Sequence, residues 1–96
     1  MTEEEQFQQL IAHNLARLSN IAAEWTAHLS TADRDWLTVT ALNVAWHRRH
    51  AYEPRRGIVL WFEACVQEAA NQRPRWRVHT VNGLEWVSPR HLRRQA

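Results

Sequence analysis

Several residue types are scarce in this sequence of 96 residues, and each scarcity excludes a class of protein. Cys65 is the single cysteine, so an internal disulfide is excluded and a reducing compartment is indicated. Two glycines are too few for the glycine-rich loops that hold nucleotide phosphates. The longest apolar run covers residues 58–62, which is far too short to span a bilayer.

Lysine is missing altogether, and all twelve basic residues are arginines. The guanidinium group offers a planar fork to phosphate or carboxylate groups and also stacks on aromatic rings. The codon usage of a GC-rich genome also accounts for the missing lysines. The positions of the arginines therefore carry more information than their number.

The arginines are concentrated in the second half of the chain. Residues 1–47 carry six acids and two arginines, which gives −4, whereas residues 48–96 carry four acids and ten arginines, which gives +6. This division predicts an acidic face and a basic face that attract different partners.

The apolar content is sufficient for one hydrophobic core. It amounts to 45% of the residues and includes six tryptophans, whose rings cover a large core area. The first six residues are acidic and polar, where a signal peptide would be basic and then apolar. We therefore predict a single domain over residues 1–96 that lies in the cytoplasm and does not contact a membrane.

A long amphipathic helix is predicted over residues 3–29, capped by Thr2. Its apolar residues step by four and three, and form a continuous stripe. Such a helix spans about 40 Å, whereas a compact domain of this size is about 30 Å across. The helix therefore projects from the domain, bends near Ser19 and Asn20, or packs on a second copy, and projection with an exposed apolar stripe is the least favoured. We predict a homodimer through five residues of the stripe: Ile11, Leu15, Leu18, Ala22 and Trp25.

Two further helices are predicted. Ser30 and Asp33 have the spacing of a capping box, which begins a second helix over residues 30–51. Residues 37–40 alternate and are partly β-branched, which would also suit a strand. A third helix is predicted from residue 58 to about residue 71, because its apolar residues recur at helical spacing: Ile58, Trp61, Phe62, Cys65, Val66 and Ala69.

After Pro74 the spacing of the apolar residues changes from that of a helix to that of β-strands, which predicts a β-hairpin. Residues 76–81 and 84–88 flank Asn82 and Gly83, a strong signal for a two-residue turn. Three pairs follow from that turn: Val81 with Leu84, His79 with Trp86, and Val78 with Val87. The expected core face carries Trp76, Val78 and Val87, and the opposite face carries Arg75, Arg77, His79 and Trp86.

The predicted fold class is therefore α+β and mostly α, with three helices followed by a C-terminal hairpin. This order of elements is that of a winged-helix DNA-binding domain, an analogy of architecture alone. Glu63 and Glu68 on the third helix argue against a recognition role for that helix. Residues 90–96 are predicted to form a basic, mobile tail.

No group of residues indicates catalysis. Cys65 lies on the apolar stripe of the third helix, where a small core residue is expected. His47 and His50 lack the paired Cys and His spacings of zinc sites. We predict that the protein is not an enzyme and that it binds neither a cofactor nor a metal ion.

The basic second half of the chain predicts a small regulatory module that binds nucleic acid, and DNA is the preferred ligand. Arginines neutralise phosphates and exposed rings stack on bases. The predicted binding residues are Arg48, Arg49, Arg55, Arg56, Arg75, Arg77 and Trp86. The alternative is a protein-interaction or inhibitor module of the phage or plasmid type. That module would dimerise through its first helix and engage a partner protein.

Overall fold

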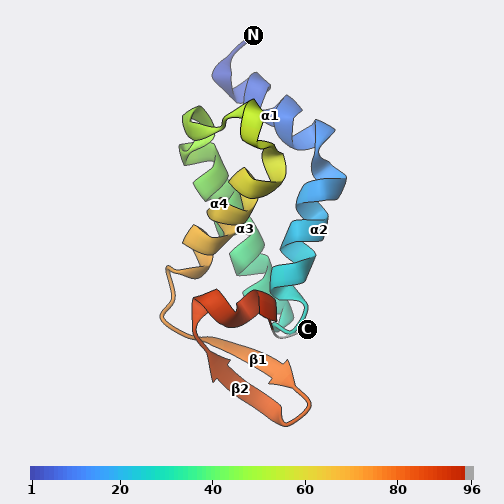
Figure 1. The fold of residues 1–96 in the computed structure, drawn as a ribbon, viewed down its shortest axis with the longest axis vertical. Coiled ribbons are helices and arrows are strands. Elements are labelled where there is room, and N and C mark those ends of the chain that lie inside the picture. Colours follow the sequence, from blue (N-terminus) through green and yellow to red (C-terminus); the bar gives the residue numbers. More distant parts are fainter. Residues whose placement is uncertain (95–96) are drawn as a thin grey trace.

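The computed structural model describes the backbone of residues 1–94 and the side chains of residues 1–93. Its described part contains four α-helices followed by a two-stranded antiparallel hairpin (Figure 1). The helices are α1 (Glu3–His13), α2 (Leu15–Thr26), α3 (Thr31–His47) and α4 (Ile58–Ala70). The strands are β1 (Trp76–Thr80) and β2 (Gly83–Val87), and three 3₁₀ turns are η1 (Arg49–Ala51), η2 (Pro54–Arg56) and η3 (Pro89–Arg94). The mostly helical α+β class is confirmed, whereas the number of helices is four instead of three.

The molecule is elongated, with extents of 50 × 23 × 22 Å. Figure 1 shows α1 at one end of the long axis and the hairpin at the other, with α2, α3 and α4 running between them. None of the helices in the described residues is long and apolar enough to cross a membrane.

The helix predicted over residues 3–29 is interrupted at Asn14. The backbone of Asn14 has φ −117° and ψ 14°, and its side-chain Nδ2 donates to the carbonyl oxygen of Leu10 at 2.9 Å. The bend therefore lies several residues before Ser19 and Asn20, where a bend was predicted. It allows the ring of Phe7 on α1 to meet Trp46 on α3 edge to face, with 5.2 Å between ring centroids. The homodimer prediction rested on the length of a single helix over residues 3–29. Because the chain bends at Asn14, a second copy is not required to explain that length.

The second predicted helix is confirmed at its start and shortened at its end. The Ser30 hydroxyl accepts a hydrogen bond from the backbone N–H of Asp33 at 3.2 Å, as a capping residue does. Residues 37–40 are helical and not extended. The helix ends at His47, and the tighter turn η1 follows it.

The core lies between α2, α3 and α4 and extends to β1. Four alanines are almost fully buried where α3 and α4 pack closely: Ala41, Ala45, Ala69 and Ala70. Small side chains allow the two helix axes to approach each other. Larger buried residues fill the remaining space: Leu18, Ile21, Trp25, Leu37, Ile58, Phe62, Val66, Trp76, Val78 and Leu92.

The hairpin forms as predicted, but its register differs. The observed pairs are Trp76 with Val87, Arg77 with Trp86, Val78 with Glu85, His79 with Leu84 and Thr80 with Gly83. The turn thus consists of Val81 and Asn82. A type I′ turn at Asn82 and Gly83 would require positive φ at both residues, and no non-glycine residue in the described chain has positive φ. Gly83 takes φ 105° directly after the turn. The observed register is shifted by two residues from the predicted one, since Val87 pairs with Trp76 instead of Val78. A shift by an even number leaves each side chain on its face, so Trp76 and Val78 still point to the core.

The residues expected to form a mobile tail are folded up to Arg94. They form η3, and Leu92 within it is 2% exposed. Arg93 forms ion pairs with Glu24 of α2 and Glu63 of α4, each at 3.1 Å. In Figure 1 this segment, drawn in red, lies across the end of the helices, between them and the hairpin. Residues 95–96 of the predicted tail lie outside the described residues.

Candidate functional site

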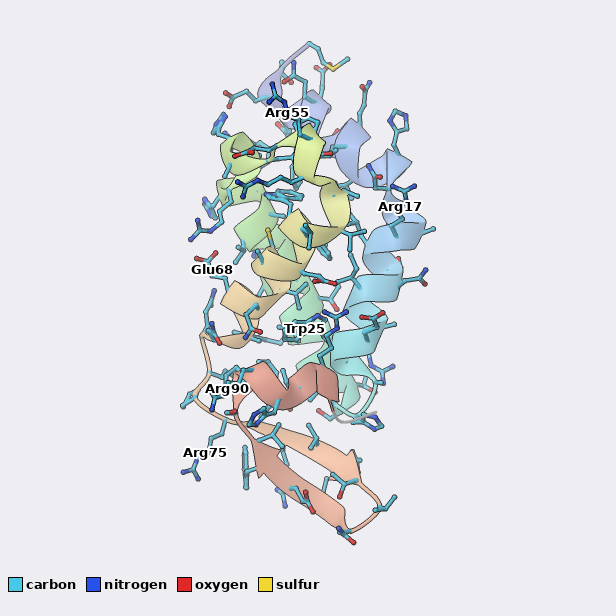
Figure 2. The ribbon with its side chains drawn as sticks, viewed as in Figure 1. Arg17, Trp25, Arg55, Glu68, Arg75 and Arg90 are labelled. Atoms are coloured by element: carbon cyan, nitrogen blue, oxygen red, sulfur yellow. The ribbon has the colours of Figure 1, made fainter. Side chains whose placement is uncertain are left out.

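The residues predicted to bind nucleic acid lie in two separate groups. Arg48, Arg49, Arg55 and Arg56 are near η1 and η2, whereas Arg75, Arg77 and Trp86 belong to the hairpin end. Figure 2 shows Arg55 and Arg75 toward opposite ends of the molecule. The continuous basic surface expected from both groups is therefore not formed.

Most of the first group is neutralised by acids of the same chain. Arg48 forms two hydrogen bonds with the carboxylate of Glu68 on α4, one of them 2.6 Å long. This contact raises the pKa of Arg48 and lowers the pKa of Glu68. Arg56 pairs with Glu53 at 3.3 Å. Both arginines therefore already hold a carboxylate where a phosphate would have to bind.

Arg49 has a structural role between α1 and α3. Its guanidinium lies 3.8 Å from the ring centroid of Trp46 and donates to the Trp46 carbonyl oxygen at 2.8 Å. It also donates to Glu3 at 2.8 Å. The hydrogen bond from Arg49, and then the charge of His50, lower the pKa of Glu3. Arg49 thus holds the start of α1 against the end of α3.

The acidic and basic halves of the sequence are partly folded onto each other. Among the described residues, three carboxylate–arginine pairs join them: Glu3 with Arg49, Asp33 with Arg73, and Glu24 with Arg93. Arg73 also lies over the rings of Trp36 and Trp76, at 4.2 and 4.5 Å from their centroids. Three of the six acids of residues 1–47 are therefore held by arginines of the second half, so this part of the charge division stabilises the fold.

The second group remains accessible on the outer face of the hairpin, which we define as Arg75, Arg77, His79, Leu84 and Trp86. Trp86 is 61% exposed, and the Arg77 guanidinium lies 5.7 Å from its ring centroid. Neither Arg75 nor Arg77 forms an ion pair with any described residue. An exposed indole with the Arg77 guanidinium beside it is suited to stacking and to phosphate contacts.

A second surface feature is an apolar groove of about 470 Å³ between α2 and α3. It is lined by Ile11, Leu15, Leu18, Ser19, Ala22, Ala23, Thr26, Ala27, Arg34, Thr38, Leu42 and Phe62. Leu15 is 59% exposed and Leu42 is 36% exposed, so the groove opens to solvent. Arg34 is its charged residue.

Four of the five residues predicted for a dimer interface line this groove. Trp25, the fifth, is 5% exposed and packs in the core, and Figure 2 shows it among the helices, on the helix side of η3. The sequence interpretation missed the α3 side, where Arg34, Thr38 and Leu42 follow one another at intervals of four residues. That spacing was readable as one helix face. The homodimer itself stays a prediction.

Helix α4 does not present the surface of a recognition helix. Six of its residues are buried, and its two acids, Glu63 and Glu68, hold Arg93 and Arg48. Cys65 is buried, and burial raises the pKa of its thiol to about 11. No group of three or more His, Cys, Asp or Glu side chains in the described part of the chain is arranged to hold a metal ion.

No protein-family model matches the chain, and no significant match was found among curated proteins or solved structures. A function must therefore be argued from the two surfaces themselves.

Proposed function

We propose that the chain is a non-catalytic module that binds single-stranded nucleic acid with the outer face of the hairpin. The observation that carries this proposal is Trp86, an indole that is 61% exposed beside the guanidinium of Arg77, which forms no ion pair with a described residue. An apolar ring in solvent gains free energy when a base stacks on it, about 1–3 kcal/mol per base.

The arrangement favours a single strand over a duplex. The faces of the bases are stacked on one another in a duplex and become accessible to an aromatic side chain in a single strand. The charges at this end are also few. Arg75 and Arg77 lie on the outer face, and Arg90 is exposed at the same end of the molecule (Figure 2). Three phosphate contacts suit a short single-stranded site.

The experiment is a fluorescence-anisotropy titration of labelled single-stranded DNA and RNA oligonucleotides, with a duplex of the same sequence for comparison. With three contacts at about 0.7 per contact, log affinity falls by about 2 per unit of log salt. The affinity should then drop about 20-fold between 50 and 200 mM salt. Trp86→Ala should weaken binding about 5- to 150-fold, the equivalent of one lost stacking contact.

Arg56→Ala is the matched control for Arg77→Ala. Both variants remove one guanidinium, but Arg56 lies on η2 and pairs with Glu53. Arg77→Ala should weaken binding and flatten the salt dependence, whereas Arg56→Ala should leave Kd within a factor of two. Absence of binding to any oligonucleotide at 50 mM salt would overturn the proposal, and so would equal losses in the two variants.

Protein binding is the second candidate function, and the apolar groove between α2 and α3 is the observation that favours it. Exposed apolar surface of this kind on a small domain marks an interaction site. The two candidates use different surfaces and do not exclude each other.

A further inference from the structure

We propose that the groove between α2 and α3 holds an amphipathic helix of a partner protein, whose apolar side contacts the groove and whose carboxylate pairs with Arg34. This binding site is separate from the outer face of the hairpin and does not depend on nucleic-acid binding. The shape of the groove, its hydrogen bonding and its charge each support this occupant.

The groove has the length and the wall of a helix-binding site. Its lining continues along the whole of α2, from Leu15 to Thr26 and the following Ala27, and α2 is about 18 Å long. Small residues form much of this wall: Ser19, Ala22, Ala23 and Ala27. They allow the backbone of a docked helix to approach closely, while Leu15 and Leu42 offer apolar contacts.

The polar side chains of the wall have few hydrogen bonds to offer. The Thr26 hydroxyl donates to the carbonyl oxygen of Ala22 at 2.8 Å, and the Thr38 hydroxyl donates to that of Arg34 at 2.9 Å. An extended peptide needs partners for its own backbone groups, whereas a helix satisfies most of these groups internally. The groove therefore favours a helix.

Arg34 determines the charge of the occupant. It lines the groove and forms no ion pair with any described residue. By contrast, Arg48, Arg49, Arg73 and Arg93 each pair with an acid of this chain. A carboxylate on the partner helix would complete the same kind of pair, with planar bidentate geometry available to the guanidinium.

A second copy of this chain fits the groove less well. The α2 residues that line the groove carry no carboxylate, and the nearby Glu24 is already held by Arg93. A second α2 docked here would leave Arg34 without an acid. The occupant is therefore assigned to a different chain.

The probes are synthetic helical peptides of about 16 residues with leucines on one side. One carries Glu at the N-terminal end of the leucine face, one carries Glu at the C-terminal end, and matched peptides carry Gln or Lys there. Both ends are tested because a helix can enter the groove in either direction. Binding to the full chain is measured by anisotropy of a label on the peptide.

One Glu peptide should bind at least 10-fold more tightly than its Gln counterpart. Arg34→Glu should reverse this preference and favour the Lys peptide. Leu15→Glu should weaken binding at least 10-fold, whereas Leu60→Glu should leave it unchanged. Leu60 is the matched control because it is 62% exposed on α4, outside the groove, against 59% for Leu15. The circular dichroism spectrum checks that each variant is folded.

Three results would overturn the proposal. The first is that no peptide binds, and the second is that Arg34→Glu leaves the preference for Glu unchanged. The third is a dimeric mass by light scattering at 50 µM that Leu15→Glu converts to a monomer, since a second copy would then occupy the groove. Leu15→Glu should bind oligonucleotides as the unmodified chain does, so failure at the hairpin and failure at the groove are distinguishable.

Discussion

Burial and local partners decide what a single side chain contributes, as two tryptophans of the hairpin show. Trp76 is 1% exposed, and its Nε1 donates to the carbonyl oxygen of Ala70 at 2.9 Å. Trp86, on the opposite face of the hairpin, is 61% exposed. The first ring stabilises the fold and the second is free to bind a ligand.

The same reasoning predicts that Cys65 is unreactive in the folded protein. Burial raises the pKa of its thiol to about 11, and the charge of Glu68 adds to the shift. At pH 8 the thiolate, which is the reactive form, is therefore about 100-fold rarer than in an unfolded chain. A thiol reagent should label the native protein at least about 100-fold more slowly than the protein in denaturant. Equal rates would show that the site opens freely.

At the scale of the elements, ion pairs fasten the helices to one another. Glu68 joins α4 to the end of α3 through Arg48, and Glu3 joins α1 to η1 through Arg49. Both carboxylates have a lowered pKa because they accept a hydrogen bond from the arginine. Arg48 and both carboxylates are exposed, so the Arg48 pair adds a small increment to the stability, whereas Arg49 is only 22% exposed.

These two pairs predict a loss of stability in acid. A lowered pKa in the folded state means that the contribution is present above the ordinary value of 4.5 and is lost as the pH falls through the lowered value. Denaturation in urea at pH 7, 5 and 3.5 should show Glu68→Gln less stable than the unmodified chain at pH 7, with a difference that shrinks below pH 4.5.

Glu5→Gln is the control, because Glu5 forms no ion pair with a described residue. Its effect should change less between pH 7 and pH 3.5 than that of Glu68→Gln. A Glu68→Gln effect that grows in acid would contradict the assignment of the Arg48 pair.

Helix α1 is predicted to be a separately unfolding element. It has no fully buried residue, and Phe7, Leu10 and Ile11 are only partly buried against the core. The Phe7 ring contacts Trp46, and Glu3 pairs with Arg49. Phe7→Ala should cost about 1–2 kcal/mol, less than the 3–5 of a fully buried phenylalanine. Hydrogen exchange should accelerate in residues 3–13 and much less in α4. Gln8→Ala, an exposed change on the same helix, should alter neither.

Sequence patterns predicted the elements that depend on local chemistry. The cap at Ser30, the apolar period of α4 and the two faces of the hairpin are all present in the structure. The break at Asn14 was missed because the apolar stripe continues through it. The contact that the bend allows is between Phe7 and Trp46, which are 39 positions apart, so no local pattern indicates it. The hairpin register was missed because the turn type depends on φ at Asn82, which the sequence suggests but does not determine.

The candidate surfaces were predictable to different degrees. Residue spacing placed Arg75, Arg77 and Trp86 on one face of the hairpin. Arg77 and Trp86 are paired across the two strands, and Arg75 is exposed directly before β1. The ion pairs of Arg48 and Arg49 join residues 20 and 46 positions apart, so no local pattern could reveal them. The groove required knowledge that α2 and α3 lie side by side, which a helix periodicity does not give.

At the scale of the whole molecule, η3 connects parts that are far apart in the sequence. This short segment contacts α2, α4 and β1. Its side chains hold these elements in two ways, because Leu92 is buried among them and Arg93 pairs with Glu24 and Glu63. The hairpin reaches the helices independently through the N–H of His79, which donates to the carbonyl oxygen of His28 at 2.9 Å.

Two neighbouring substitutions distinguish the two ways in which η3 acts. Leu92→Ala removes a side chain that is 2% exposed and should cost about 2–4 kcal/mol of unfolding free energy, because a cavity opens at the junction of three elements. Arg93→Ala breaks two ion pairs, but the arginine is 45% exposed, so water compensates for most of the loss and the cost should stay within about 1 kcal/mol. Urea denaturation followed by tryptophan fluorescence measures both. If Arg93→Ala proved the more costly of the two, charge and not apolar burial would hold the C-terminal segment to the helices.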